Sequence, residues 1–268
     1  MAPKIEIYSD TNAPTDMLSK PLTAGTQPPL ASSPVLKNLF DQTYEERWSK
    51  ESFQKVVQAW KLKTDEQQRL MELKVAVKDV TSWKNNPLDL VRFMRSPGKS
   101  VEDRFREMID WREKQGADQL VELYRPHRAL LWYIPSAILK GLDKDGDPIY
   151  LERGGVMDGV GLLQHFDKND IIKHIVWLRE IATRGDYVQE YEQRTGRAPA
   201  QVTILYDMQG MSSRDLKALP LFKEIVTINQ TRYCGLAKRI ILLRAPAAFQ
   251  VIWNIAKHFC KLDISNGV

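Results

Sequence analysis

The apolar segments VTILYD (residues 202–207) and RIILL (residues 239–243) decide the fold of this chain. Their cores are continuous apolar runs rich in β-branched residues, which is typical of strands covered on both faces of a sheet. Between them, helical sequence begins at Ser212, is interrupted at Pro220 and continues to Ile228. Strand, helix and strand in this order predict parallel strands joined by a right-handed crossover.

Further helices and strands are predicted both before and after these two segments. Upstream, Asp145-Gly146 predicts a hairpin turn that feeds a strand at 149–151. A helix capped by Asp167 follows, with one apolar face. Downstream, the segment 246–259 predicts a last helix with one narrow polar face and a wide apolar arc. The arc fits an ordinary helix that covers a sheet, and it also fits a helix that roofs a cavity or enters a membrane surface.

The region before residue 126 has a different pattern. Residues 1–42 are rich in proline and polar residues, which predicts a flexible tail. Residues 43–125 predict a helical region, with a capping box at Thr64 to Gln67, a cap at Asn86 followed by Pro87, and a helix over 100–116. We therefore expect an α/β fold class, in which an N-terminal helical bundle precedes a mostly parallel sheet with crossover helices over 126–268.

Composition and charge restrict the function classes. The 268 residues are 43% apolar and 27% charged, as in ordinary globular proteins. No secretory signal or run long enough to span a membrane is recognised, so we expect a soluble, cytoplasmic chain. The net charge is +5, and residues 201–268 supply an excess of five (nine cations minus four anions). Such an excess attracts nucleic acid or an anionic bilayer, or is a scatter of solvated charges, and no nucleic-acid-binding motif accompanies it.

Several short motifs resemble catalytic or metal sites but are incomplete. Pro97 to Ser100 lacks the first glycine of a phosphate-binding loop, and the acidic run from Asp143 to Asp147 lacks the glycine and glutamate of a calcium loop. Cys234 and Arg239 are one residue too close for a phosphatase cradle, and the four histidines have no metal-ligand spacing. The sequence therefore predicts no enzyme, no cofactor and no metal site.

Taken together, four segments resemble the CRAL-TRIO lipid-transfer family. They are the helical stretch from Asp65 to Arg112, the hairpin and strand over 143–153, the strand and turn VTILYDMQG over 202–210, and Ala245-Pro246 with Phe249 and Trp253. Three features depart from the family pattern. Gly235 stands where phosphoinositide binders carry Glu, Arg244 replaces an Asn, and the chain ends before the strand and helix that follow the gate helix in the family. We expect this last departure to leave an unpaired sheet edge.

The resemblance implies that residues 126–268 form a lipid-binding domain whose sheet floors an apolar cavity beneath a gate helix, 246–259. The implied ligand is a phospholipid or other hydrophobic small molecule, exchanged at an anionic membrane surface. Its relatives also include scaffolds that bind small GTPases, so a protein-interaction module is the alternative. The candidate cavity residues, each of which fits plain core equally well, are Ile175, Leu178, Val202, Ile204, Tyr206, Ile225, Ile228, Ile240, Leu242, Phe249, Ile252, Trp253 and Phe259. The candidate membrane contacts are Lys238, Arg239, Arg244 and Lys257.

Overall fold

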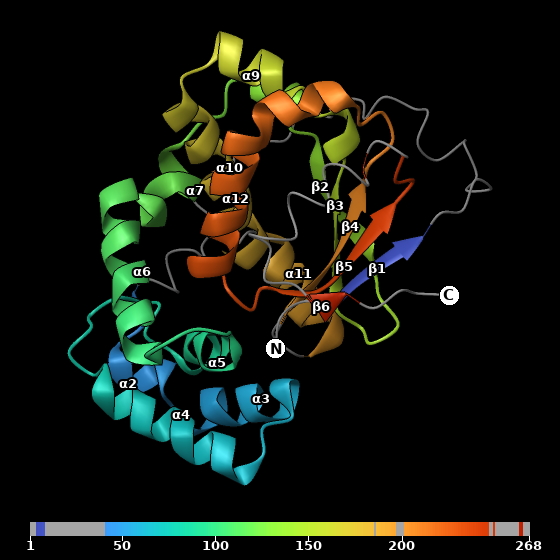
Figure 1. The fold of residues 1–268 in the computed structure, drawn as a ribbon. Helices are drawn as coiled ribbons and strands as arrows, with labels where there is room; N and C mark the ends of the chain where they lie inside the picture. Colours follow the sequence, from blue (N-terminus) through green and yellow to red (C-terminus); the bar gives the residue numbers. More distant parts are fainter. Residues whose placement is uncertain are drawn as a thin grey trace.

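A six-stranded mixed sheet forms one layer of the computed structural model, which describes residues 4–8, 41–184, 186–196, 201–246, 249 and 263–264 (Figure 1). The order across the sheet is β2-β3-β4-β5-β1-β6. The strands are β1 (Lys4–Tyr8), β2 (Ser136–Leu142), β3 (Pro148–Glu152), β4 (Val202–Asp207), β5 (Ala237–Leu243) and β6 (Asp263–Ile264). Only β2 and β3 are antiparallel, and the other neighbours pair in parallel. The expected α/β class with a mostly parallel sheet is confirmed.

The expected hairpin joins β2 to β3. The Asp143 carboxylate accepts hydrogen bonds from the backbone N–H groups of Asp145 (2.9 Å) and Asp147 (2.8 Å), and Gly146 adopts φ +78°. Glycine takes this left-handed conformation without steric cost, so the Asp-Gly pair sets the turn.

Strand β1 is a feature that the composition of residues 1–42 did not predict. Lys4–Tyr8 pairs in parallel with Arg239–Leu243 of β5. The edge of β5 that we expected to be unpaired is therefore hydrogen-bonded to the N-terminal strand.

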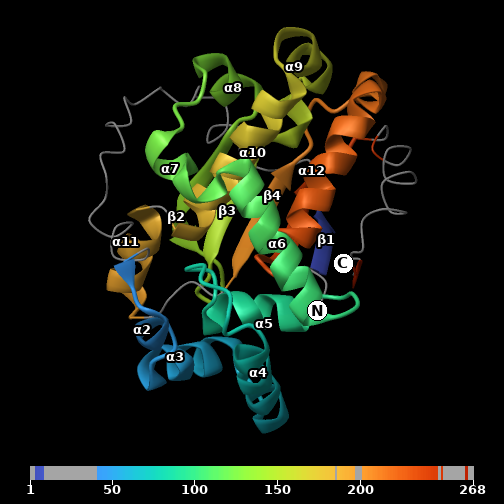
Figure 2. The ribbon, with the colours of Figure 1, turned by 90° about the vertical axis from the view of Figure 1, so that its left-hand side faces the viewer.

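Helices α10 and α12 of the C-terminal part lie side by side and face the strands from one side of the sheet (Figures 1 and 2). This part contains η3 (Gly154–Val156), α9 (Gly159–His165), α10 (Lys168–Arg184), α11 (Asp186–Thr195), η4 (Ser213–Ala218) and α12 (Leu219–Thr231). Pro220 lies in the first turn of α12, where its missing N–H leaves no helical hydrogen bond unmade.

The N-terminal helices form a separate layer below the sheet in Figure 1 and continue up its helical side. They are α2 (Tyr44–Arg47), α3 (Lys50–Trp60), α4 (Thr64–Ala76), α5 (Pro87–Arg95), α6 (Val101–Gln115), η2 (Ala117–Gln119), α7 (Leu120–Leu123) and α8 (Arg128–Tyr133). The predicted caps at Asn86 and Ser100 are present, since each side chain accepts from the N–H three residues on, at 2.9 and 3.1 Å. The predicted capping box is shifted by one residue, because Glu66 accepts from Lys63 N–H (3.1 Å) and Thr64 is already helical.

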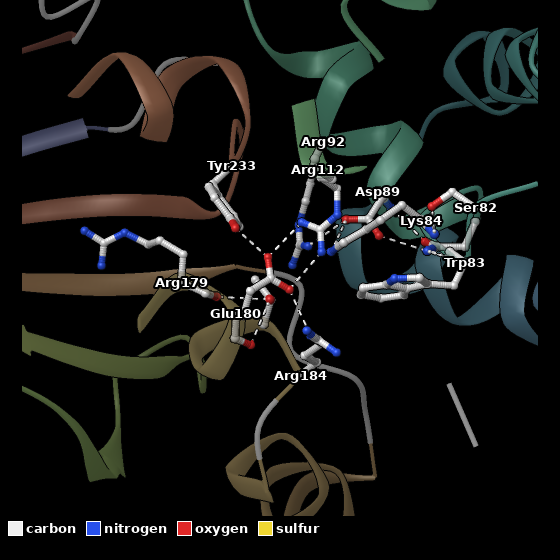
Figure 3. A network of polar contacts seen from close by, with 12 residues as sticks. Ser82, Trp83, Lys84, Asp89, Arg92, Arg112, Arg179, Glu180, Arg184 and Tyr233 are labelled. Carbon is white, nitrogen blue, oxygen red and sulfur yellow. Dashed lines mark hydrogen bonds and ion pairs between the residues drawn. The ribbon is translucent and has the colours of Figure 1, made fainter. Parts of the chain in front are cut away.

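A buried polar network joins α6 to α10 and so fixes the N-terminal helices to the sheet domain (Figure 3). At its centre the Glu180 carboxylate contacts Arg112 (2.7 and 2.9 Å), Arg184 (2.8 Å) and the Tyr233 hydroxyl (2.5 Å). Burial alone would raise the pKa of Glu180, yet the Arg112 charge and its hydrogen bonds hold that pKa far below its usual value. The network is therefore ionised.

Candidate functional site

A cavity of about 470 Å³ lies between the sheet and the two helices α10 and α12. Its volume falls within the range of roughly 300–1,000 Å³ found for ligand pockets. The lining extends from Leu219 to Thr231, the whole of α12, which corresponds to about 18 Å at 1.5 Å per residue. An elongated apolar space of this kind suits a ligand with a long hydrocarbon portion.

The floor of the cavity is made by alternate residues of β4 and β5. Val202, Ile204 and Tyr206 line it from β4, and Ile240 and Leu242 line it from β5. Ile204 is in register with Ile240, and Tyr206 with Leu242. Successive side chains of a strand point to opposite faces, so this face follows from the sequence alternation. The structure brings all five of these predicted residues together.

The helical wall comes from one stripe of each helix. On α10 the lining residues are Ile175, Leu178, Arg179 and Ala182, at the spacing of a single helix face. On α12 they include Phe222, Ile225, Val226 and Asn229.

Ile228 is the exception among the described residues predicted to line the cavity. It is 7% exposed and packs in the main core cluster, away from the cavity lining. The reason is its helical phase, because Phe222, Val226 and Asn229 place the lining stripe on the other side of Ile225.

One part of the wall is polar, and the sequence pattern did not reveal it. Arg179 forms an ion pair with Glu152 (2.6 Å), and its Nε donates to Asn229 Oδ1 (2.9 Å). The guanidinium also lies 5.5 Å from the centre of the Tyr150 ring. These four residues come from β3, α10 and α12, and only the fold brings them together. In the sequence, this polar wall was indicated only by Arg179, a charged residue on an otherwise apolar helix face.

The Tyr150 hydroxyl also lies in this polar wall. Its side chain is buried, and burial raises its pKa to about 12, against the smaller effect of hydrogen bonds to Ser136 and Arg179. The phenol is therefore protonated near neutral pH, and its O–H can donate to an oxygen atom of a bound molecule.

Glycines permit close packing at one end of the cavity. A Cβ on Gly154 would lie 2.2 Å from the Tyr206 ring, and one on Gly155 would lie 2.3 Å from backbone atoms of residues 208 and 209. Met208 and Met211 line this end, and Phe249 packs against Met208 and Leu242. Flexible methionines fit irregular apolar partners.

The structure accounts for the glycine at position 235, where the phosphoinositide binders of the family carry glutamate. Gly235 lines the cavity with φ +69°, and an added Cβ would lie 3.0 Å from Arg92 Cβ. A glutamate at this position would need both a strained backbone and a shift of Arg92.

The predicted residues of the gate helix fall mostly outside the described part of the chain. Phe249 is described and lines the cavity. The positions Ile252, Trp253, Phe259 and Lys257 lie outside the described residues.

The three other predicted membrane contacts are paired with aspartates. Lys238 contacts Asp145 (2.9 Å) and Asp147 (2.5 Å), and Arg239 lies 3.7 Å from Asp145. Arg244, after the opposite end of β5, pairs with Asp207. The structure therefore separates Arg244 from the other two, and membrane contact by these residues stays a prediction.

Two properties of the described residues bear on other functions. No helix among them is both long and apolar enough to cross a bilayer. They also contain no group of three or more His, Cys, Asp or Glu side chains arranged to hold a metal ion.

Comparison with known proteins agrees with the resemblance. Protein real-time of Anopheles gambiae is 27% identical over 201 residues, which cover 72% of this chain and 29% of that protein. Protein real-time of Aedes aegypti is 30% identical over 178 residues, covering 63% and 27% respectively. The chain thus spans less than a third of the length of these curated relatives.

Among solved structures, the crystal structure of Sfh5 aligns with a TM-score of 0.48 at 17% identity, over 61% of this chain and 59% of that one. A similarity this low adds nothing to the description of the sheet. The decisive match is that of residues 136–266 to the model of the CRAL/TRIO domain, a family that binds lipophilic molecules. The CRAL/TRIO family is therefore the family to which residues 136–266 of this chain are similar.

Proposed function

We propose that residues 126–268 enclose a phospholipid or other small hydrophobic molecule in the cavity and transfer or present it at membranes, without covalent chemistry. The observation that carries this is the mostly apolar space of about 470 Å³ between the sheet and α10 and α12. Each methylene that leaves water gains about 0.8 kcal/mol, and a bilayer offers the same gain. A carrier must therefore enclose its ligand almost completely. We place the chain in the cytoplasm, in transient contact with membranes.

The polar wall suggests what the ligand carries besides hydrocarbon. Arg179 is already neutralised by Glu152, so the wall offers little net charge to an anionic group. The Tyr150 hydroxyl is a neutral, protonated hydrogen-bonding group in this wall. We therefore expect the ligand to place a hydrogen-bond acceptor, such as a carbonyl, ester or hydroxyl oxygen, within reach of Tyr150.

Enclosure requires a part that opens, and we assign this role to the segment 246–259. Phe249 packs over Met208 and Leu242 at one end of the cavity. Replacing Phe249→Asp together with Trp253→Asp should abolish lipid transfer between liposomes. Unchanged transfer would exclude the gate role.

The ligand itself can be tested by native mass spectrometry and organic extraction of the purified chain. The wild-type protein should carry a lipid. Ile240→Trp places a larger side chain in the cavity and should yield lipid-free protein. Ile241→Trp, the next residue on the opposite face of β5, is the matched control and should retain the lipid. Equal lipid content in the two variants would contradict binding in this cavity.

The alternative function is a protein-interaction scaffold for small GTPases or other signalling proteins. It predicts that the purified wild-type chain is empty and captures a GTPase in a pull-down. A bound lipid that is lost only in Ile240→Trp would decide against it.

A further inference from the structure

Most of the strongly exposed apolar side chains belong to elements that follow one another in the chain, between Leu120 and His165. Seven large apolar side chains are strongly exposed within the described residues, and five of them belong to α7, α8, η3 and α9. These five are Leu123, Leu131, Trp132, Val156 and Leu163. Helices α7, α8 and α9 follow one another along the upper side of Figure 2. The most exposed are Leu123 (71%) and Trp132 (65%).

Two arginines without an ion-pair partner among the described residues lie in the same part of the chain. Arg125 and Arg128 are both exposed, and neither forms an ion pair within the described part of the chain. Arg125 donates only to the backbone carbonyls of Glu122 (2.6 Å) and Tyr124 (3.1 Å). Glu122 is the one acidic residue between Leu120 and Tyr133, so this stretch carries a net charge of +1 (two minus one).

Charges on the adjacent helix do not reverse this sign. Lys173 of α10 lies 5.6 Å from the Tyr124 ring centre, and Asp170 acts on the same tyrosine. The two charges offset each other. The contrast with Lys238 and Arg244 is clear, because those cations are neutralised by aspartates.

Helix α8 is firmly attached although one of its faces is exposed. Leu130 is buried in the main core, and the rings of His127 and Tyr133 pack against Phe166 at 5.3 and 6.5 Å between centres. Directly after α8, Ile134, Pro135 and Ser136 enter the cavity lining. A surface formed by α8 is therefore rigid and continuous with the cavity wall.

We propose that Leu123, Arg125, Arg128, Leu131 and Trp132, here called the α7–α8 face, dock on an anionic lipid bilayer. Trp132 and Leu131 would enter the boundary between headgroups and acyl chains, where the amphipathic indole is favoured. Arg125 and Arg128 would contact lipid phosphates and acidic headgroups. This inference rests on the proposed function, because docking through this face would place the cavity wall against the membrane with which the protein exchanges lipid.

Vesicle co-sedimentation tests the apolar part of the face. The wild-type chain should bind phosphatidylcholine vesicles that contain phosphatidylserine and should bind pure phosphatidylcholine vesicles weakly. Trp132→Glu should raise the lipid concentration for half-binding by about tenfold or more, since it replaces an indole that would enter the bilayer with an acidic group. Val75→Glu is the matched control, because Val75 is equally exposed (64%) on α4 but distant in the chain from the face. It should bind like the wild type.

The basic part is tested by the double variant Arg125→Glu, Arg128→Glu. It should lose the preference for phosphatidylserine and the dependence of binding on salt. Trp132→Phe should keep binding but lose a fluorescence blue shift that the wild type shows on vesicle addition. Thermal melts of all variants check that the fold is retained, which is expected because every changed side chain is exposed.

The following results would overturn the proposed docking of the α7–α8 face on a bilayer. Equal binding by Trp132→Glu and the wild type, or no binding of the wild type to acidic vesicles, would overturn the proposal. A shift from dimer to monomer in Trp132→Glu without vesicle binding would also overturn it and would assign the face to a second copy of the chain. Because vesicle binding is measured without transfer, a chain that carries lipid but fails this test refutes only the docking face. A lipid-free chain that docks through Trp132 refutes only the cavity function.

Discussion

The two faces of α10 are filled in opposite ways. One face presents Ile175, Leu178 and Ala182 to a cavity that no side chain of the described residues fills. The other presents Glu180 and Arg184 to α6 and η2, where charged side chains fill the space and satisfy one another (Figure 3). One helix thus separates an unfilled apolar volume from a densely bonded polar junction.

This difference shows how an empty space can be maintained inside a protein. A side chain that faces a void lacks contacts on that side, so the void gives its wall no stability. Helix α10 must therefore be held from its other face. The bonds of Arg112 and Arg184 to Glu180, and of Arg184 to the carbonyls of Ala117 (3.0 Å) and Asp118 (2.7 Å), supply that attachment.

The largest expected effect comes from breaking the polar face. Glu180→Gln removes the charge that two buried arginines share, and we expect a loss of about 3–5 kcal/mol in the free energy of unfolding. Urea denaturation followed by circular dichroism measures it. Glu51→Gln, which breaks the exposed pair with Lys55, is the control and should leave the midpoint unchanged. A loss for Glu180→Gln as small as that of the control would show that the junction does not hold α10.

A second prediction concerns His174, a buried polar residue of α10 that, unlike Glu180, forms no hydrogen bond to a described residue. The His174 ring stacks on Trp177 at 5.3 Å, and neither ring nitrogen has a hydrogen-bond partner among the described residues. Burial lowers its pKa to about 4. The unfolded chain, with a histidine pKa of about 6.5, then binds more protons than the folded one. Stability contributed by neutral His174 is complete above about pH 6.5 and is lost as pH falls toward 4, by about 3 kcal/mol.

His174→Phe should remove this slope from a plot of unfolding free energy against pH between 6.5 and 4. His165→Phe, at an exposed position, should preserve it. If both variants keep the slope, the acid sensitivity arises elsewhere.

The sequence predicted those features that depend on neighbouring residues. The apolar runs of β4 and β5, the Asp-Gly turn and the cap at Asn86 are local patterns, and the structure contains each of them. Strand alternation likewise placed Ile204 and Ile240 on the cavity floor. By contrast, Arg112 and Glu180 are 68 residues apart, and no local period links them.

The surroundings of a basic residue depend on the fold and cannot be read from a count of charges. Lys238 and Arg244 come from the most basic stretch of the sequence, and both face aspartates that the fold brings from distant segments. Arg125 and Arg128 come from a less basic stretch, in which Leu130 anchors α8 in the core and leaves Leu131 and Trp132 exposed. A formal charge in the sequence says little about the potential at a surface until pairing is known.

The smallest expected effect is a difference in the free energy of unfolding between two substitutions on α12, one in the packed core and one in the cavity wall. Ile225 and Ile228 are both 7% exposed, but only Ile225 lines the cavity. In lipid-free protein, Ile228→Ala creates a new void in packed surroundings and should cost about 2–5 kcal/mol. Ile225→Ala enlarges a space that already exists and removes fewer contacts, so it should cost about 1 kcal/mol less than Ile228→Ala. Urea unfolding of both variants, with and without added lipid, measures the difference, and lipid should stabilise Ile225→Ala less than Ile228→Ala. Equal costs without lipid would mean that the wall closes around Ile225 in solution, so that the cavity exists only when a ligand holds it open.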